Sequence, residues 1–296
     1  MLTAIALLLS VVFSPIPSSA QSTQLLRLAE QLQHPEVAMR RQAARSLGRI
    51  GESHSVTLLR LAANKEPEAS IRLEIVHGLQ NIAFLRLAGY RDALGAIGQS
   101  SDPAVEVDPV VRLRAVRALW EAGERDLLDP VPYLNRALDD PNAQVSLTAV
   151  RMLRKLGTPQ TIAPLARAAA DRNQDQSIRL KAIQALGAVA LDDGGPVGRQ
   201  VIEANADRAR RLGSTPFTSP RALIPWHQIQ IRHLSALANQ ADNSPTLVLA
   251  AVKAMGKVKD KSAVPTLRKI AADHTNPTVR LQASQVLSHV IARQYE

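Results

Sequence analysis

The sequence predicts an all-α protein built from about seven helix pairs stacked side by side. Apolar residues recur with helical spacing in units of similar length, and proline and glycine mark the expected helix ends. Hydrophobic residues make up 46% of the chain but aromatic residues only 3%, so the core must consist of small aliphatic side chains. Such a core favours closely packed helices over a β-sandwich or barrel, which prefer aromatic and β-branched residues.

The repeated unit can be aligned on one position, called the anchor here, which is arginine in five of seven units. The anchors are Arg40, Arg72, Arg112, Ser146, Arg179, Val248 and Arg280. Positions −1, +3 and +7 from the anchor are apolar in every unit, as in Val111, Ala115 and Leu119. These positions share one face of an α-helix, whereas a strand would require alternation.

Helix ends are marked by proline and glycine. Proline follows a residue with a capping side chain at four expected helix starts: Asp108-Pro109, Asp140-Pro141, Ser244-Pro245 and Asn276-Pro277. Glycines near the far ends are expected to be C-terminal stops: Gly48, Gly123, Gly157, Gly187 and Gly256. Second apolar segments then follow, at Val56–Ala63, Val131–Leu138, Ile162–Ala170 and Val264–Ala272. Each unit is therefore predicted to be a helix, a turn and a second helix.

The spacing of the anchors sets the expected limits of the repeat domain, residues 21–296. Neighbouring anchors lie 32 to 40 residues apart, but 69 residues separate Arg179 from Val248. We interpret the wide gap as an insertion at about residues 192–225, because Trp226–Gln240 has a helical pattern typical of a second helix. A decayed repeat is the alternative. Thr23–Leu32 is expected to be a lone second helix that caps the N-terminal end.

Residues 1–20 have the layout of a secretory signal peptide. The apolar run Leu2–Phe13 is followed by helix breakers, and Ser18 and Ala20 are small residues before a candidate cleavage site at Gln21. The run is too short to span a bilayer, which needs about 20 apolar residues. No lysine or arginine precedes the run, so a retained N-terminal anchor is the alternative. We expect an exported protein, periplasmic, thylakoid-luminal or extracellular, without an integral membrane segment after cleavage.

Charge and composition narrow the function classes. The chain has 36 Lys and Arg against 26 Asp and Glu, a net charge of +10, which favours acidic partners. It has no cysteine, which excludes disulfides, thiolate catalysis and cysteine-based zinc sites. His227 and His233 are six residues apart and do not share a helix face, and Gly194-Gly195 lacks the Lys-Ser/Thr of a phosphate loop. We expect no catalytic residue, no metal and no cofactor.

The motifs Pro109-Val-Val-Arg-Leu-Arg-Ala-Val-Arg-Ala-Leu and Asn276-Pro-Thr-Val-Arg-Leu-Gln-Ala-Ser-Gln-Val-Leu resemble the short HEAT-like repeat of phycobilisome (PBS) lyases. The resemblance covers about residues 22–296 apart from the insertion, although Ser146 and Val248 depart from the usual arginine. It implies a right-handed α-solenoid of about seven HEAT-like helix pairs that holds another macromolecule. It also implies that the second helices line the concave side.

Three sets of mainly cationic residues can be distinguished: the anchors, a row five residues after them, and cations of the second helices. The anchor arginines recur in most units, which favours a structural role in which each bonds a turn carbonyl or carboxylate. Another row lies five residues after the anchors, off the apolar stripe: Arg45, His77, Arg117, Arg151, Gln184, Lys253 and Gln285. The candidate partner-binding residues are the cations of the second helices and two aromatic residues of the insertion and its edge: Arg27, Arg60, Arg136, Arg167, Arg268, Lys269, Phe217 and Trp226. The alternatives are a solvated charged face and aromatics that pack back on the repeats.

The function predicted from these features is that of an exported, non-catalytic scaffold that binds a protein with an acidic surface through a basic concave face. A bilin lyase or isomerase similar to the PBS lyases is one alternative, although those enzymes act in the cytoplasm. The other alternative is a nucleic-acid-binding helical-repeat protein, which the expected export disfavours.

Overall fold

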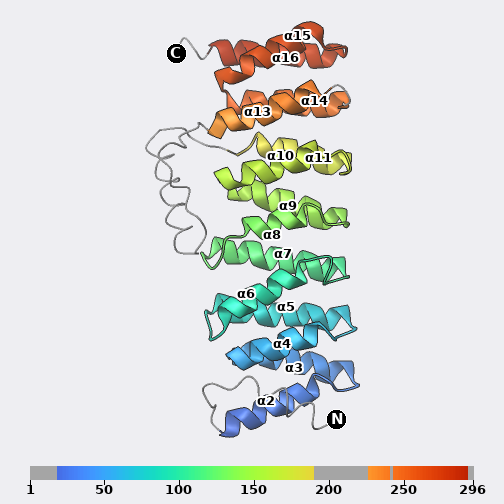
Figure 1. The fold of residues 1–296 in the computed structure, drawn as a ribbon, viewed down its shortest axis with the longest axis vertical. Coiled ribbons are helices and arrows are strands. Elements are labelled where there is room, and N and C mark those ends of the chain that lie inside the picture. Colours follow the sequence, from blue (N-terminus) through green and yellow to red (C-terminus); the bar gives the residue numbers. More distant parts are fainter. Residues whose placement is uncertain (1–18, 190–225, 241–242, 293–296) are drawn as a thin grey trace. The chain divides into compact units, whose positions relative to one another are not determined.

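The computed structural model describes residues 19–189, 226–240 and 243–292, and these residues are mainly α-helical, as predicted (Figure 1). The first helices of the repeated units are α3 (Val37–Ile50), α5 (Ala69–Phe84), α7 (Pro109–Glu124), α9 (Ala143–Leu156), α11 (Gln176–Leu186), α14 (Pro245–Val258) and α16 (Pro277–Ala292). The second helices are α4 (Ser53–Ala63), α6 (Tyr90–Ser100), α8 (Val131–Ala137), α10 (Ile162–Ala170), α13 (Trp226–Asn239) and α15 (Val264–Asp273). The expected N-terminal cap is α2 (Ser19–Gln31), and two 3-10 turns, η1 (Pro159–Thr161) and η3 (Lys261–Ala263), precede α10 and α15.

The chain divides into two compact units, residues 1–128 (unit 1) and 129–296 (unit 2), each of which is described by itself. In unit 1, α3, α5 and α7 pack in one layer and α2, α4 and α6 in a second. In unit 2, α9, α11, α14 and α16 form one layer and α10, α13 and α15 the other, with α8 packed on α9. Figure 1 shows the helices of each unit following one another in chain order. The paired repeat packing predicted from the anchors is confirmed.

The core is built from the predicted apolar columns. All seven residues at position +3, such as Ala43 and Ile75, have no exposed surface. Positions −1 and +7 are also buried except for Met39 in the first unit of the repeat and Leu287 in the last, which are half-buried. Full burial of a leucine or isoleucine side chain stabilises the fold by about 1.5–3 kcal/mol, so these columns supply much of the driving force.

Three of the five glycines expected to end helices do not do so. Gly157 and Gly187 are at the C-caps of α9 and α11, as predicted. Gly48, Gly123 and Gly256 instead lie inside α3, α7 and α14. The prediction was wrong for these three, and for Gly48 the reason is that a glycine also serves where two backbones meet. A Cβ on Gly48 would lie 2.4 Å from the Cα of Gly78 in α5.

The expected N-caps are confirmed at two of four helices. The carboxylate of Asp108 and the amide oxygen of Asn276 accept hydrogen bonds from first-turn backbone amides of α7 and α16. At α9 the cap is Asn142 rather than Asp140, whose carboxylate accepts from the backbone amide of Asn142. Ser244 makes no side-chain capping bond to α14.

Some predictions concern residues that the structure does not describe. The signal segment up to residue 18 and the insertion at 192–225, with Phe217, lie outside the described residues. Within the described ranges, none of the helices combines the length and hydropathy of a transmembrane span.

Candidate partner-binding surface

The second helices of each unit lie beside one another and expose one continuous layer. In unit 1, α4 packs against both α2 and α6, and in unit 2, α13 packs against both α10 and α15. The exposed side chains of α2, α4 and α6 in unit 1, and of α8, α10, α13 and α15 in unit 2, are called the second-helix surface of each unit here. Because each helix contributes about one face, equivalent side chains become neighbours along this surface.

The structure places the predicted cations on this surface. Arg27 and Arg60 are exposed on α2 and α4 of unit 1. In unit 2, exposed cations occur on three second helices: Arg136, Arg167, Arg268 and Lys269. Trp226 is the first residue of α13 and is half-buried. The candidate residues are thus gathered into one group in each unit.

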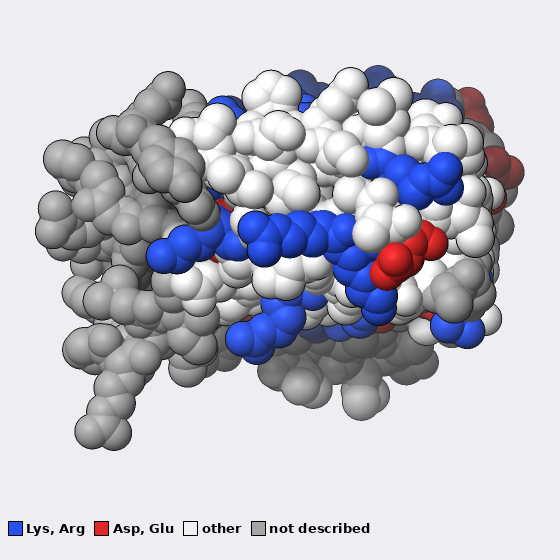
Figure 2. All heavy atoms as spheres, turned by 90° about the horizontal axis from the view of Figure 1, so that it is seen from above, with Lys and Arg blue, Asp and Glu red and all other residues white. Residues whose placement is uncertain are grey.

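These cations differ in how they are paired. Arg167 donates to the carboxylate of Asp139 at 2.8 Å and to the backbone and side-chain oxygens of Asn135, so its charge is already compensated. Among the described residues, Arg27, Arg60, Arg268 and Lys269 make no ion pair. Figure 2 views the molecule from the end where α15 and α16 lie and shows Lys and Arg side chains spread over this end, with few Asp and Glu. These four cations are therefore open to an acidic partner.

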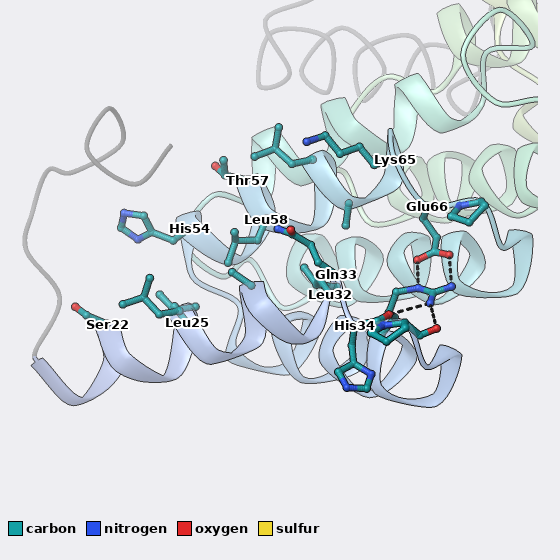
Figure 3. A pocket seen from close by; sticks show the side chains of 17 residues that line it. Ser22, Leu25, Leu32, Gln33, His34, His54, Thr57, Leu58, Lys65 and Glu66 are labelled. Carbon is teal, nitrogen blue, oxygen red and sulfur yellow. Dashed lines mark hydrogen bonds and ion pairs between the residues drawn. The ribbon is translucent and has the colours of Figure 1, made fainter. Parts of the chain in front are cut away.

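An apolar groove of about 540 Å³, called the α2–α4 groove here, opens between two second helices of unit 1. Leu25, Leu32 and Leu58 lie between α2 and α4, with His54 at one end and Lys65 toward the other (Figure 3). Leu26 and Leu61 also line it, and Leu26 remains 39% exposed. Sequence reasoning missed this groove. Its signal was an excess of leucine in α4, where Leu58, Leu59 and Leu61 cannot all face the core.

Arg40 and Glu66, which line the α2–α4 groove at the end away from His54, are already bonded (Figure 3). Arg40 donates to both carboxylate oxygens of Glu66, at 2.9 and 3.0 Å, and to the carbonyls of His34 and Pro35. This carboxylate raises the pKa of Arg40 further above its ordinary value. Lys65 is exposed and makes no ion pair among the described residues. The groove thus has an apolar floor and one available positive charge.

A second groove of about 470 Å³ lies on the other side of α4, against α6. It is more polar, and its lining includes Arg60, Asn64 and Gln99 together with the Arg72–Glu106 ion pair. Arg60 is the one predicted partner-binding residue that lines either of these grooves.

The anchor arginines have the structural role expected of them. The Nη1 group of Arg72 donates to the carbonyls of residues 66 and 67, and Arg112 and Arg280 bond the carbonyls five and six residues before them in the same way. Arg72 also donates to both carboxylate oxygens of Glu106, at 2.8 and 2.9 Å. At the anchor that is serine, the hydroxyl of Ser146 keeps the bond to the carbonyl six residues earlier.

The acceptors of these arginines were not predicted. Glu66 and Glu106 each lie six residues before the following anchor, and each also accepts a hydrogen bond from the backbone amide two residues later. Asn243 takes this place for Arg179, at 2.6 Å. The repeated acid or amide before each helix-starting proline could have revealed them. One arginine and one acceptor thus connect successive units of the repeat.

The row five residues after the anchors belongs to a surface network in unit 1. Arg45 donates to Glu74 at 2.5 Å, and this bond lowers the pKa of Glu74. Burial, and then the charge of Arg114, lowers the pKa of His77. Arg114 also bonds Gln80, which donates to Glu121 at 2.6 Å. Of this row, Arg45 is compensated locally by Glu74, which supports a solvated charged face at this position.

The described residues hold no cluster of three or more His, Asp or Glu placed to bind a metal ion. The Nε2 group of His227 donates to a carboxylate oxygen of Asp260 at 2.8 Å, which ties α13 to the turn before α15. His233 is half-buried elsewhere on α13.

Sequence comparison identifies repeats of one kind along the chain. A family model described as HEAT repeats matches residues 102–187 and 231–293, more than half of the chain in all. A model described as the PBS lyase HEAT-like repeat matches residues 39–65. No curated protein matches the sequence.

Solved structures with a similar fold include three of different description. Human deoxyhypusine hydroxylase in complex with glycerol is 18% identical, with a TM-score of 0.38, over 94% of this chain and 100% of that one. Importin beta is 13% identical, with a TM-score of 0.44, over 93% of this chain and 36% of that one. The complex of CpcE and CpcF of phycocyanin lyase from Nostoc sp. PCC7120 is 17% identical, with a TM-score of 0.37, over 94% and 99%.

Proposed function

Because the chain belongs to the HEAT-repeat proteins, we propose that it is a non-catalytic scaffold that binds a protein partner with an acidic surface through its second-helix surface. HEAT repeats generally bind proteins, since stacked helix pairs present extended surfaces rather than enclosed sites. The proposed binding residues are Arg27 and Arg60 in unit 1, and Arg136, Arg167, Arg268 and Lys269 in unit 2.

The observation that carries the proposal is the difference between the two sets of cations. The anchor arginines are held by carbonyls just before their own helix, and Arg72 also by a carboxylate of the next repeat, Glu106. Arg27, Arg60, Arg268 and Lys269 are exposed and make no ion pair among the described residues. Cations that no intramolecular contact uses gain most from an acidic partner, and their charge speeds its association.

The same proposal includes export of the chain, so its partner is expected outside the cytoplasm. The apolar run Leu2–Phe13 and the small residues Ser18 and Ala20 support export through a signal peptide. The compartment is then the periplasm, a thylakoid lumen or the extracellular space. N-terminal sequencing of the protein purified from its compartment tests this part, and a cytoplasmic protein with an intact N-terminus would contradict it.

Affinity capture with two charge-matched variants tests the binding surface. One variant changes Arg27, Arg60, Arg268 and Lys269 to Glu. The control changes four exposed cations of the first helices to Glu: Arg117, Lys181, Lys253 and Lys257. The wild type and the control should capture the same protein from a periplasmic extract, with less bound as salt is added, and the surface variant should not. Equal capture by both variants, or capture of nucleic acid in a gel shift instead, would refute the proposal.

A lyase-like activity is the second candidate, favoured by the PBS lyase HEAT-like repeat at residues 39–65. It predicts that the purified protein accelerates attachment of a bilin to an apo-phycobiliprotein, followed by absorbance. No acceleration over the uncatalysed reaction would remove this candidate.

A further inference from the structure

The α2–α4 groove is long enough to bind a short helix of a partner protein. Its lining extends from Ser22 on α2 to Leu32, the residue after α2, about three helical turns or about 15 Å. On the other side it covers a similar stretch from His54 on α4 to Lys65, just after α4 ends. The two helices thus present facing apolar ridges, open along their length, and a third helix can lay its side chains between such ridges.

The chemistry of the lining favours a helix over a small molecule. Small-molecule sites place several free polar groups around an enclosed ligand, and these groups fix its orientation. Here Arg40 and Glu66 bond each other, and Arg40 also bonds the carbonyls of His34 and Pro35. Polar residues such as Gln33 and Thr57 also line the groove, but most of its exposed area is apolar, with five leucines and two alanines, and contributes contact without direction. That kind of contact suits the apolar stripe of an amphipathic helix.

The charge around the groove indicates which helix fits. The charges of Arg40 and Glu66 compensate each other, whereas Lys65 at the rim and Arg60 in the adjoining groove make no ion pair among the described residues. The charge left for a partner is therefore positive. We propose that the α2–α4 groove binds an amphipathic, acidic helix of the partner, about three turns long, with its apolar stripe on Leu26, Leu58 and Leu61 and an acidic residue next to Lys65. This proposal rests on the proposed function and assigns the partner's central contact to one groove.

Defined peptides test the groove without knowledge of the partner. The first probe is a fluorescein-labelled helical peptide with leucines at i, i+4, i+7 and i+11 and glutamates beside them. The second has the same composition with the leucines distributed around the helix, and the third has lysine in place of glutamate. Fluorescence anisotropy with the full chain should show binding of the first peptide, and binding at least about tenfold weaker of the other two.

Variants connect the binding to the groove. Leu26→Glu and Lys65→Glu should each weaken binding of the first peptide by about tenfold, and the effect of Lys65→Glu should shrink at high salt. The matched control is Leu85→Glu, because Leu85 is also an exposed leucine of unit 1, 61% exposed, but lies outside the groove. The control should bind as the wild type does. Circular dichroism confirms that each variant is folded, and Lys65→Glu alone decides the matter if Leu26→Glu is not.

Three results would overturn the proposal. The first is equal binding of the acidic peptide and the peptide with scattered leucines, and the second is no binding of the acidic peptide. The third is self-association of the chain that Leu26→Glu abolishes, since the occupant would then be a second copy. The proposed function survives these results if the Arg27, Arg60, Arg268 and Lys269 variant still loses the captured partner while Leu26→Glu retains it. Both fail if neither variant changes capture.

Discussion

Gly48 lies inside α3 at the point where this helix meets α5. A Cβ placed on Gly48 would lie 2.4 Å from the Cα of Gly78 and 3.3 Å from its carbonyl carbon. Carbon atoms in contact are normally about 3.5–4.0 Å apart, so the two helices must separate by more than about 1 Å to accept an alanine. Backbone atoms cannot move aside as the end of a flexible side chain can.

The free energy of unfolding of Gly48→Ala follows from two opposing effects. Overpacking of a close contact destabilises a fold by about 1–3 kcal/mol. Alanine in place of glycine inside a helix stabilises it by about 0.5–1 kcal/mol, because less backbone entropy is lost on folding. The net expectation for Gly48→Ala is destabilisation by about 1–2 kcal/mol.

Gly95 in α6 is the matched control. It is also helical, but no atom outside its own helix lies within 4 Å of the Cβ position. Gly95→Ala should therefore stabilise the protein by about 0.5–1 kcal/mol. Urea unfolding followed by far-ultraviolet circular dichroism measures both, and the two midpoints should shift in opposite directions. If both alanine variants are stabilised, the contact between α3 and α5 is not as close as the structure places it.

Two further predictions concern charged groups. Glu106→Ala leaves the largely buried guanidinium of Arg72 without its carboxylate and should destabilise the fold by about 3 kcal/mol. Glu74→Ala should cost under about 1 kcal/mol, because its partner Arg45 has a side chain that is 56% exposed. Urea unfolding compares the two, and equal losses would contradict this assignment. Burial lowers the pKa of His233 below its ordinary 6.5, so the unfolded chain binds a proton at this residue more readily than the folded chain. The contribution of His233 to the free energy of unfolding is therefore present above pH 6.5 and falls as the pH drops below it. His233→Gln should reduce the drop in melting temperature between about pH 7.5 and pH 5.5, and an unchanged drop would exclude His233 as its cause.

The helix pairs could be predicted from the sequence because their determinants are local and repeated. Position +3 is fully buried and apolar in every repeat, and it is alanine in six of seven, with Ile75 as the exception. The structural role of the anchor arginines followed from the same regularity. The helix α6 received no separate prediction, although Tyr90–Ser100 completes the second pair.

The candidate site was predicted only in part. The exposure of Arg60 could be foreseen from its place on a helix, but its groove depends on how far α4 stands from α6. The α2–α4 groove likewise arises from the packing of helices that are distant in sequence, so no single segment encodes it. Gly48 shows the same limit, because a close approach and a helix stop look alike in one sequence.

The contrast between the two kinds of arginine indicates where function can lie in a repeat of this kind. A side chain that joins one unit to the next must recur at a fixed position, and Arg40 and Arg72 do so with nearly the same bonds. A partner is not periodic in this way, so the residues that bind it need not recur. Lys65 and Leu26 belong to no repeated column, yet they lie on the same groove, and this departure from the repeat is what a contact selected for a partner would produce.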